Sequence, residues 1–410
     1  MLNGKKILLG VSGGIAVYKA VEVVSRLRKA GAEVRVVMTE NATKFVTPML
    51  FKEISNNPVA VSLWADNPEF YAEHIKLAEW ADILVVAPAT ANVCAKLANG
   101  FADDILTSVA LAIPETKPIL ICPAMNCDMY ANVATQENLN KLLGRENYFV
   151  VEPEDGLLAC GTSGKGRLPE PMDIVEHIDA TLGECYGDLV GRYILVTAAG
   201  TRENIDPVRF IGNRSSGKMG YAIARAALSR GALVTLVTGP SCEITPCEAN
   251  VINVESTQEM YDACLAVYPV VDVVIKAAAV ADYRPHKTVS QKIKKEKDDK
   301  FNLLLDKNPD ILYELGQRKK KQILVGFAAE TTKVVEYAKA KIVKKNLDLI
   351  VANDVTQAGA GFNVDTNIVK LIDAKGKVTE LTEMSKLDVA HKILDKVLSL
   401  ELGSYGKKQR

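Results

Sequence analysis

KILLGVSGGIAVYKAVEVVSRLRKAGAEVRVVMT (residues 6–39) is the stretch that decides the fold class. An apolar run over Lys6–Val11 leads into the turn SGG at 12–14, a helical pattern follows over Ile15–Ala30, and Glu33–Met38 forms a second apolar run. A strand, a glycine turn, a helix and another strand are the repeating unit of a parallel sheet covered by helices. We therefore predict an α/β, doubly wound (Rossmann-like) fold.

The same alternation continues along the chain and starts a second time after residue 191. Further strands are predicted in the first half at Asp82–Ala87 and Pro118–Cys122. The second start reads as strand, long loop, helix and strand, over Tyr193–Thr197, Ala198–Gly217, Lys218–Arg230 and Leu233–Thr238. A chain of 410 residues is too long for one ordinary core. We predict two doubly wound domains, 1–188 and 189–410, with the boundary near Gly183–Gly191.

The composition is that of an ordinary globular protein and excludes several partner classes. Lys+Arg and Asp+Glu both number 50, so the net charge is zero and gives no electrostatic reason to expect nucleic acid or a membrane surface as a partner. No apolar run approaches the roughly 20 residues of a membrane span. The start of the chain lacks the features of a signal peptide. We expect a cytoplasmic protein.

The eight cysteines are scattered and show no CxxC spacing. This usage favours reduced thiols over a disulfide framework. Four of them, Cys94, Cys122, Cys185 and Cys264, stand among apolar residues or near helix ends, so we expect them to be buried as small hydrophobic side chains.

The glycine turn at 12–14 lies where parallel sheets bind ligands, beyond the carboxyl end of a strand. Glycine allows a close backbone approach, and the N-terminus of the following helix attracts phosphate. The turn is not GxGxxG, so it fits the single phosphate of a mononucleotide better than a dinucleotide. A purely structural turn is an equal alternative.

A second candidate anion site is the segment NRSSGKMG (213–220). Its serines, glycines, lysine and helix start could surround an anion. It does not match a Walker A loop, because Met219 follows Lys218 where that motif needs Ser or Thr. An ordinary P-loop ATPase is therefore disfavoured.

Three polar residues in the first half are candidates for chemistry. His74 precedes a predicted strand on a helical stretch and suits proton transfer, although a lone histidine is more often a surface residue. Asn126 follows the strand that ends at Cys122; it could bind a substrate amide or carboxylate, or simply cap a helix. Cys160 stands in the cationic, glycine-rich loop ACGTSGKGR (159–167), which suits a proton donor.

Lys292 opens the charged run KIKKEK (292–297). Such a run is usually a solvated face, and its mixed charges argue against a nucleic-acid patch. A single lysine from it that reaches triphosphate oxygens is the sharper possibility.

Together these segments closely resemble the bifunctional phosphopantothenoylcysteine decarboxylase/phosphopantothenate–cysteine ligase family of bacteria, over nearly the whole chain. The first domain matches in GVSGGIAVYK (10–19), HIKLAEWAD (74–82), APATAN (87–92), PAMNCDMY (123–130) and ACGTSGKGR (159–167). The second matches in TAAGTRENIDPVRFIGNRSSGKMG (197–220), AAVADYRP (278–285), KIKK (292–295), KNPDI (307–311), GFAAET (326–331) and KKNLDLIVAND (344–354). Cys127, Asp128 and Leu168 are minor departures at variable positions.

For the first domain, the resemblance implies FMN and the decarboxylation of 4′-phosphopantothenoylcysteine. His74 would act as the base in oxidation of the cysteine moiety, Asn126 would bind the substrate, and Cys160 would donate the proton when the reduced flavin returns its hydride. The residues implied to hold FMN are Ser12, Gly13, Gly14, Thr39, Pro88, Ala89, Thr90, Asn92 and, more loosely, Ser108.

For the second domain, the resemblance implies that CTP activates 4′-phosphopantothenate as an acyl-cytidylate, which the amine of cysteine then attacks. Asn213 is implied in use of this intermediate, Lys292 in its formation, and Asp282 in binding Mg²⁺, which arrives largely on nucleotide oxygens. The residues implied to bind CTP are Lys276, Ala277, Ala278, Asp282, Lys292, Asn308, Pro309, Asp310, Ile311, Phe327, Lys341 and Lys345. The residues themselves do not decide between CTP and ATP.

Two other functions compete with the bifunctional enzyme that the resemblance implies. Flavin prenyltransferases and peptidyl-cysteine decarboxylases share elements of the first domain, but not the ligase-like second half. A non-catalytic regulatory flavoprotein is the alternative from another class; His74, Asn126 and Cys160 together disfavour it. The resemblance also implies a homo-oligomer, a dodecamer built from trimers and dimers.

Overall fold

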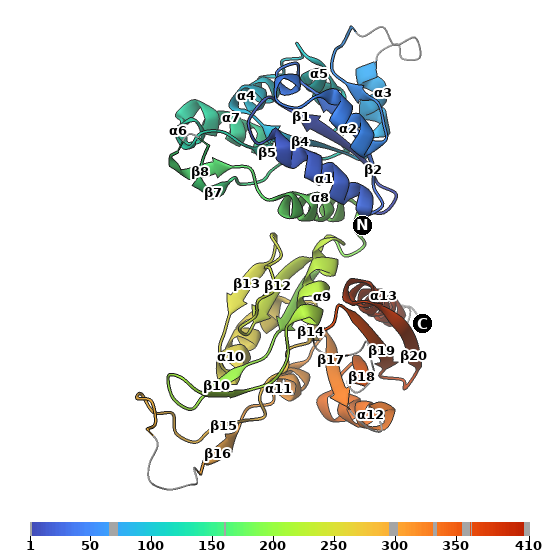
Figure 1. Cartoon of the computed structure of the whole chain (residues 1–410). Coiled ribbons are helices and arrows are strands. Elements are labelled where there is room, and N and C mark those ends of the chain that lie inside the picture. The colour runs from blue at the N-terminus through green and yellow to red at the C-terminus, as the bar shows by residue number, and fades with distance from the viewer. Residues whose placement is uncertain are drawn as a thin grey trace. The chain divides into compact units, whose positions relative to one another are not determined.

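The computed structural model describes residues 2–64, 73–159, 161–294, 302–330, 334–354, 361 and 363–405. Its internal contacts divide the chain into two compact units, Met1–Gly187 and Asp188–Arg410 (Figure 1). Each unit has its own hydrophobic cores, and each is therefore described by itself.

The first unit is built on a six-stranded parallel sheet in the order β3-β2-β1-β4-β5-β6. The strands are β1 (Lys6–Val11), β2 (Glu33–Met38), β3 (Val59–Ala60), β4 (Ile83–Ala89), β5 (Ile119–Pro123) and β6 (Tyr148–Val150). This is the doubly wound order, in which the direction of winding reverses between β1 and β4. The crevice at this reversal is the expected ligand site.

Helices cover both faces of this sheet, because each helix has an apolar stripe that is buried against the sheet. The helices are α1 (Val17–Lys29), α2 (Pro48–Ser55), α3 (Glu73–Trp80), α4 (Ala91–Asn99), α5 (Ile105–Ala112), α6 (Cys127–Ala131), α7 (Val133–Leu143) and α8 (Pro171–Tyr186). One core lies between the sheet and α1, α2 and α8; the other lies between the sheet and α3, α4, α5 and α7. Strands β7 (Glu154–Leu157) and β8 (Ser163–Arg167) form a separate antiparallel hairpin.

The second unit contains an eight-stranded sheet in the order β13-β12-β9-β14-β17-β18-β19-β20. Its parallel strands are β9 (Tyr193–Ala198), β12 (Leu233–Thr238), β13 (Asn250–Asn253), β14 (Val273–Lys276), β17 (Ile323–Glu330) and β18 (Leu349–Asp354); β19 (Thr366–Asp373) and β20 (Val378–Ser385) are antiparallel. The parallel part repeats the winding order of the first unit, with the reversal between β9 and β14.

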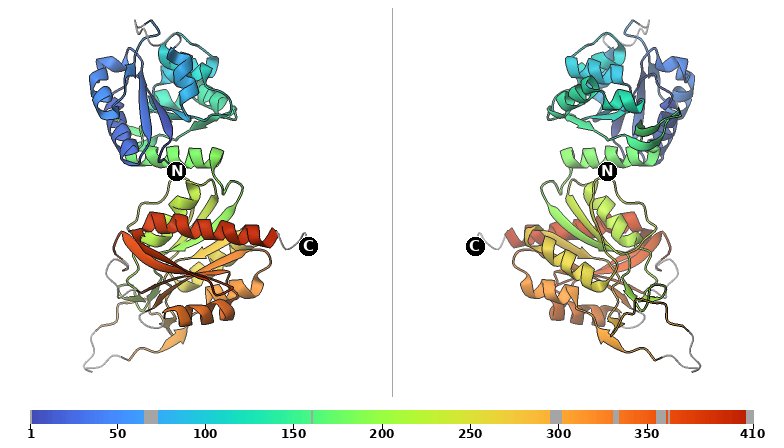
Figure 2. Two further views of the ribbon diagram at one scale, coloured as in Figure 1. Left: turned by 90° about the vertical axis from the view of Figure 1, so that its right-hand side faces the viewer. Right: turned by 90° about the vertical axis from the view of Figure 1, so that its left-hand side faces the viewer.

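The helices of the second unit also lie on both faces of its sheet (Figure 2). Helices α9 (Lys218–Leu228) and α13 (Lys386–Tyr405) pack on one face. Helices α10 (Thr257–Val267), α11 (Ile311–Arg318) and α12 (Val334–Lys345) pack on the other. No helix among the described residues is long and apolar enough to cross a membrane.

The predicted fold class is confirmed, and the six predicted strands lie within two residues of observed ones. The predicted loop Ala198–Gly217 is wrong in part, because it contains the short antiparallel pair β10 (Arg202–Asn204) and β11 (Phe210–Gly212). The buried Asp206 carboxylate closes their turn by accepting from the N–H groups of Val208 and Arg209, both at 2.9 Å. Strands of three residues are too short to show a hydrophobic period.

The cysteine prediction holds for Cys94, Cys122 and Cys264, which are buried and free. Burial raises the pKa of all three thiols to about 12, which leaves them chemically inert. Cys185 is exposed, so its predicted burial is wrong. It lies in the last turn of α8, on a side of the helix that the sheet does not cover.

Candidate functional sites

A cavity of about 400 Å³ opens in the first unit where the winding reverses between β1 and β4. Its walls come from the start of α1, the end of β4, the segment before α6, and the β7–β8 hairpin. The lining residues are Gly14, Ile15, Ala16, Tyr18, Lys19, Pro88, Thr90, Ala91, Ala124, Met125, Asn126, Met129, Leu157, Leu158, Ala159, Gly166, Arg167 and Leu168. Most of them are apolar, which suits a flat ring system.

One end of this first cavity is suited to a phosphate. Helix α1 begins after Ala16 and α4 begins after Thr90, and in the described part of the chain neither cap residue accepts a side-chain hydrogen bond at its helix start. Two helix N-termini thus lie at one cavity, where their dipoles favour a negative charge. In α1 the N–H groups of Val17 and Lys19 already donate to the carbonyls of Gly14 and Ala16, both at 3.0 Å. A Cβ on Gly13 would stand 2.7 Å from the backbone of Asn41, so only glycine allows this turn.

Ser12 ties the two strands of the crevice together. Its buried hydroxyl donates to the Pro88 carbonyl at 2.7 Å and accepts from the Thr90 N–H at 3.0 Å. It therefore fixes the loop after β4 against the loop after β1. Its position beneath the cavity makes Ser12 a support for the lining residues.

Asn126 caps a helix and also lines the first cavity. Its side-chain oxygen caps α6 by accepting from the N–H groups of Asp128 at 2.8 Å and Met129 at 3.4 Å. The same side chain lines the first cavity. The capping bonds fix the orientation of the amide, because they engage its oxygen at the helix start.

The β7–β8 hairpin is seated against the segment before α6. The Met125 N–H donates to the Gly166 carbonyl at 2.9 Å, and Gly166 lies too close to the Met125 carbonyl to carry a Cβ. Lys19, only 5% exposed, donates to the Leu168 carbonyl at 2.8 Å and pairs with Glu170 at 3.0 Å. The lysine lowers the pKa of the Glu170 carboxyl. These bonds anchor the base of the hairpin at the cavity.

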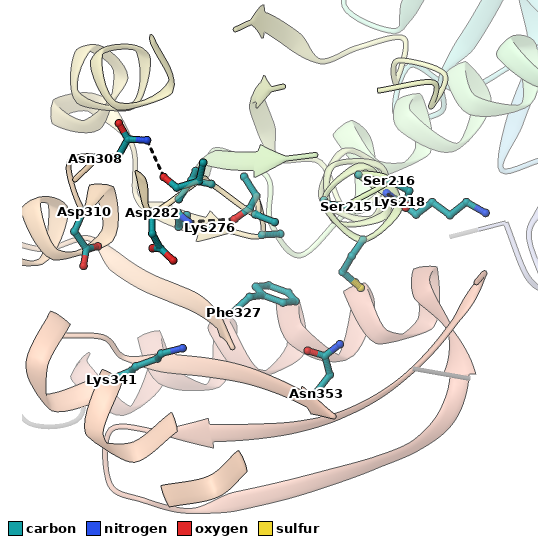
Figure 3. Close-up of a pocket in the computed structure, with 18 of the residues that line it drawn as sticks. Ser215, Ser216, Lys218, Lys276, Asp282, Asn308, Asp310, Phe327, Lys341 and Asn353 are labelled. Atoms are coloured by element: carbon teal, nitrogen blue, oxygen red, sulfur yellow. Dashed lines mark hydrogen bonds between the residues drawn. The ribbon is translucent and has the colours of Figure 1, made fainter. Parts of the chain in front are cut away.

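A second cavity, of about 360 Å³, opens in the second unit where its winding reverses (Figure 3). Its walls come from the start of α9, the loops after β14 and β16 (Leu305–Lys307), and parts of β17 to β19 and α12. The lining residues are Ser215–Gly220, Lys276–Asp282, Lys307–Asp310, Phe327, Lys341, Lys345, Asn353, Gly361, Asn367 and Lys386. It is more polar than the first cavity.

One end of this second cavity is the start of α9. Gly217, with φ of 90°, is the cap residue and has no side chain to cap the helix; the Ser216 hydroxyl accepts from the Lys218 N–H at 3.5 Å. The Ser241 hydroxyl donates to the Ser216 carbonyl at 2.8 Å and supports this loop from behind. The predicted anion site is thus an exposed helix N-terminus on a glycine turn, next to the Lys218–Asp365 ion pair of 2.6 Å.

The other end holds Lys276, Asp282, Asn308 and Asp310 (Figure 3). Asp310 caps α11 by accepting from the Tyr313 N–H at 3.1 Å, and it pairs with Lys345 at 2.9 Å. Burial, and secondarily the charge of Lys345, lower the pKa of Lys276 to about 8. An ammonium group with this pKa is sensitive to pH near neutrality.

Comparison with known proteins identifies the chain. A model of the DNA/pantothenate metabolism flavoprotein C-terminal domain matches residues 189–400, and a flavoprotein model matches residues 1–183. The coenzyme A biosynthesis bifunctional protein CoaBC of Bacillus subtilis (strain 168) is 49% identical over 402 residues, 98% of each chain. The chain belongs to this family. The resemblance inferred from its motifs is confirmed.

Other members of the family are similarly close. The CoaBC protein of Escherichia coli (strain K12) is 44% identical and covers 97% of this chain and 98% of its own length. A crystal structure of the C-terminal domain of a CoaBC protein shares 46% identity over 52% of this chain and 97% of that chain, with a TM-score of 0.45.

The flavin-site predictions of the family resemblance fall into two groups. Gly14, Pro88, Thr90 and Asn126 line the first cavity. Ser12, Gly13, Thr39, Ala89, Asn92, Ser108 and His74 are not among the described residues that line it. Cys160 lies outside the described residues. Tyr18, Lys19 and Met129 line the cavity but were not predicted; Tyr18 and Lys19 stand one helical turn after the glycine turn, which was the available signal.

The CTP-site predictions agree more closely with the second cavity. Ten of them line it: Lys276, Ala277, Ala278, Asp282, Asn308, Pro309, Asp310, Phe327, Lys341 and Lys345. Ile311, the first residue of α11, is buried in the core. Lys292 is exposed and is not among the described residues that line the cavity. Asn213 is also outside it, where its amide donates to the Ala279 carbonyl and its oxygen accepts from the Ser215 N–H at 3.0 Å. Asn353, Asn367 and Lys386 were missed.

Proposed function

We propose that the chain converts 4′-phosphopantothenate to 4′-phosphopantetheine in two steps. The domain 189–410 couples 4′-phosphopantothenate to cysteine with CTP, and the domain 1–188 decarboxylates the product with FMN. Family membership confirms the prediction of a bifunctional enzyme of coenzyme A biosynthesis. The observation that carries the proposal is that each unit has a cavity at its own winding reversal, one largely apolar and one polar.

FMN fits the first cavity. The positive dipole ends of α1 and α4 suit its phosphate, and the apolar walls suit its ring system. When bound, the flavin supplies reversible two-electron oxidation of the cysteine moiety. Gly14, Pro88 and Thr90 would hold it, with Ser12 as their support.

The chain's own residues then position the substrate and move protons. Asn126, fixed by its capping bonds, would bind the carboxylate or amide of the substrate beside the flavin. His74 would take a proton and Cys160 would return one. The β7–β8 hairpin, which contributes Leu157 and Arg167 to the lining, would exclude water from the reaction.

In the ligase domain, the N–H groups at the start of α9 would bind phosphate oxygens of the nucleotide. Asp282 is exposed at the opposite end of the cavity from α9, so the phosphate that it would share with Mg²⁺ is the one that leads to the nucleoside; Mg²⁺ usually binds one or two carboxylates plus phosphate. Lys292 would neutralise the triphosphate as the acyl-cytidylate forms. Asn213 would position that intermediate for attack by cysteine.

We also propose a cytoplasmic homo-oligomer, a dodecamer of trimers and dimers, for this enzyme. The free cysteines among the described residues are consistent with a reducing compartment. The family resemblance is what supports the assembly.

Mass analysis of the products tests the proposed function. The purified, FMN-loaded chain is incubated with 4′-phosphopantothenate, cysteine, CTP and Mg²⁺. Formation of 4′-phosphopantetheine with CMP and pyrophosphate is expected. Arrest at 4′-phosphopantothenoylcysteine would support the ligase activity and refute the decarboxylase activity. Absence of any product from a folded sample would refute the enzyme and favour the regulatory flavoprotein.

A further inference from the structure

The two ends of the ligase cavity differ in what they offer a nucleotide. At α9 no carboxylate occupies the helix start in the described structure: the Lys218 N–H donates to the neutral Ser216 hydroxyl at 3.5 Å, and the Lys218 ammonium pairs with Asp365. At α11 the helix start is already occupied by the Asp310 carboxylate. If the ligand is a nucleotide, as the proposed function holds, its phosphates belong at α9. Its base then reaches the end that contains Lys276.

Lys276 is placed to donate a hydrogen bond to that base. It is the last residue of β14, so its side chain leaves the carboxyl edge of the sheet at the winding reversal. Its ammonium donates to the Ala278 carbonyl at 3.1 Å. An ammonium carries three donors, so two remain for a ligand. Within the described residues no carboxylate forms an ion pair with it, whereas nearby Lys345 is paired with Asp310.

Phe327 supplies the surface on which a base can rest. Its ring lies on the cavity wall between the two ends (Figure 3). An aromatic face binds the face of any base, so it does not by itself select one. Selection therefore depends on the polar groups around the edge of the base.

We propose that Lys276 is the specificity-determining residue that selects a pyrimidine nucleotide over ATP, by donating to the ring carbonyl oxygen of the base. Lysine is only a donor, and cytosine presents a carbonyl oxygen and an adjacent ring nitrogen as acceptors. Adenine has no carbonyl oxygen. Its acceptors are ring nitrogens, which lie elsewhere on the base than the cytosine carbonyl oxygen. A donor that loses a well-placed acceptor costs binding energy, and this loss is what discriminates against ATP.

Steady-state kinetics of two variants test this role. Lys276→Met keeps the length of the side chain but has no donor, and Lys276→Arg keeps the donor and the charge. We expect Lys276→Met to lower kcat/KM for CTP by roughly 10- to 100-fold, the usual loss for a charge-assisted hydrogen bond, with less change for ATP. Lys276→Arg should retain a preference for CTP. Lys370→Met is the matched control, because Lys370 lies on β19, beside the edge strand β20, and pairs with Glu380 there.

Calorimetric binding of cytidine and adenosine, which carry no phosphate, separates a base contact from a phosphate contact. The wild-type chain should bind cytidine more tightly than adenosine, and Lys276→Met should lose that difference. Equal losses for CTP and ATP, or unchanged cytidine binding in Lys276→Met, would overturn the assignment. Circular dichroism verifies that the variant is folded. If the wild type forms no ligation product with any nucleotide, the proposed function fails. The calorimetric difference between cytidine and adenosine binding still tests the role of Lys276 in that case.

Discussion

Asn126 has two positions of interest in one side chain, because its oxygen caps α6 while the side chain also lines the first cavity. The sequence suggested a helix cap and a place at the ligand-binding edge as alternatives. It could not show that both hold, since the cavity wall comes from segments far apart in the chain. The cysteines show the same limit of sequence-based prediction. Cys185 has sequence neighbours similar to those of the buried cysteines, yet it is exposed. At this scale, environment decides what a residue type does.

Asn126→Asp separates the two roles. Aspartate caps helices as well as asparagine, so the stability of the first unit should stay within about 0.5 kcal/mol of the wild type. The amide donor is lost and a negative charge is added, so decarboxylation should fall by at least about 10-fold. Unfolding curves and product formation from 4′-phosphopantothenoylcysteine measure the two effects. Unchanged decarboxylation would remove Asn126 from substrate binding.

The lowered pKa of Lys276 predicts a pH dependence of ligation. The protonated ammonium is the donor, and it is lost as the pH rises through its pKa of about 8. Hence kcat/KM for CTP should fall above about pH 8 in the wild type. Arginine stays protonated, so Lys276→Arg should not show this fall. A pH profile of both proteins, with ligation measured as pyrophosphate release, checks the prediction; identical profiles would contradict it.

Asn213 holds the loop after β11 through bonds to Ala279 and Ser215. We expect Asn213→Ala to let the acyl-cytidylate accumulate, because the intermediate would form but be badly placed for cysteine. Quenched-flow samples analysed by mass spectrometry would detect it. Ligation at the wild-type rate would exclude Asn213 from the mechanism.

Helix α9 illustrates how an element positions a site. Its apolar residues pack on the sheet, and its N-terminus is brought to the second cavity by a close approach at Gly220. A Cβ there would lie 2.5 Å from the Ala198 Cβ and 3.0 Å from the Thr197 carbonyl oxygen. Only glycine lets the helix start lie this near the end of β9.

Gly220→Ala should therefore push α9 away from the sheet. We expect a loss of about 1–3 kcal/mol in the free energy of unfolding of the second unit, as for other overpacked sites, with a raised KM for CTP. Gly144→Ala is the control, because its Cβ would meet its nearest atoms at an ordinary 3.6 Å. Denaturant titration and ligase kinetics test both variants; equal stability of Gly220→Ala and wild type would refute the packing argument.

At the scale of the whole molecule, each unit has its own sheet, its own pair of cores and its own cavity. Two units whose cores share no buried residues should unfold separately. A ligand stabilises only the unit that binds it, by about 2.7 kcal/mol at a concentration of 100 Kd.

Scanning calorimetry of the full chain should therefore show two transitions. Added FMN should raise the Tm of one, and CTP with Mg²⁺ should raise the Tm of the other. Lys370→Met, outside both cavities, should respond in the same way as the wild type. A single transition that both ligands raise equally would show that the units unfold together.

The sequence by itself determined the fold class of both units, six of their strands, and the glycine turns beside which each cavity opens. Apolar periodicity and glycine turns are properties of consecutive residues, so they can be read directly from the chain. Only the tertiary structure decided which polar groups meet. Ser12 reaches Pro88, and Lys218 reaches Asp365, across 76 and 147 positions. Burial and charge at Lys276 likewise depend on neighbours from other elements, because electrostatics follows distance in space and not along the sequence.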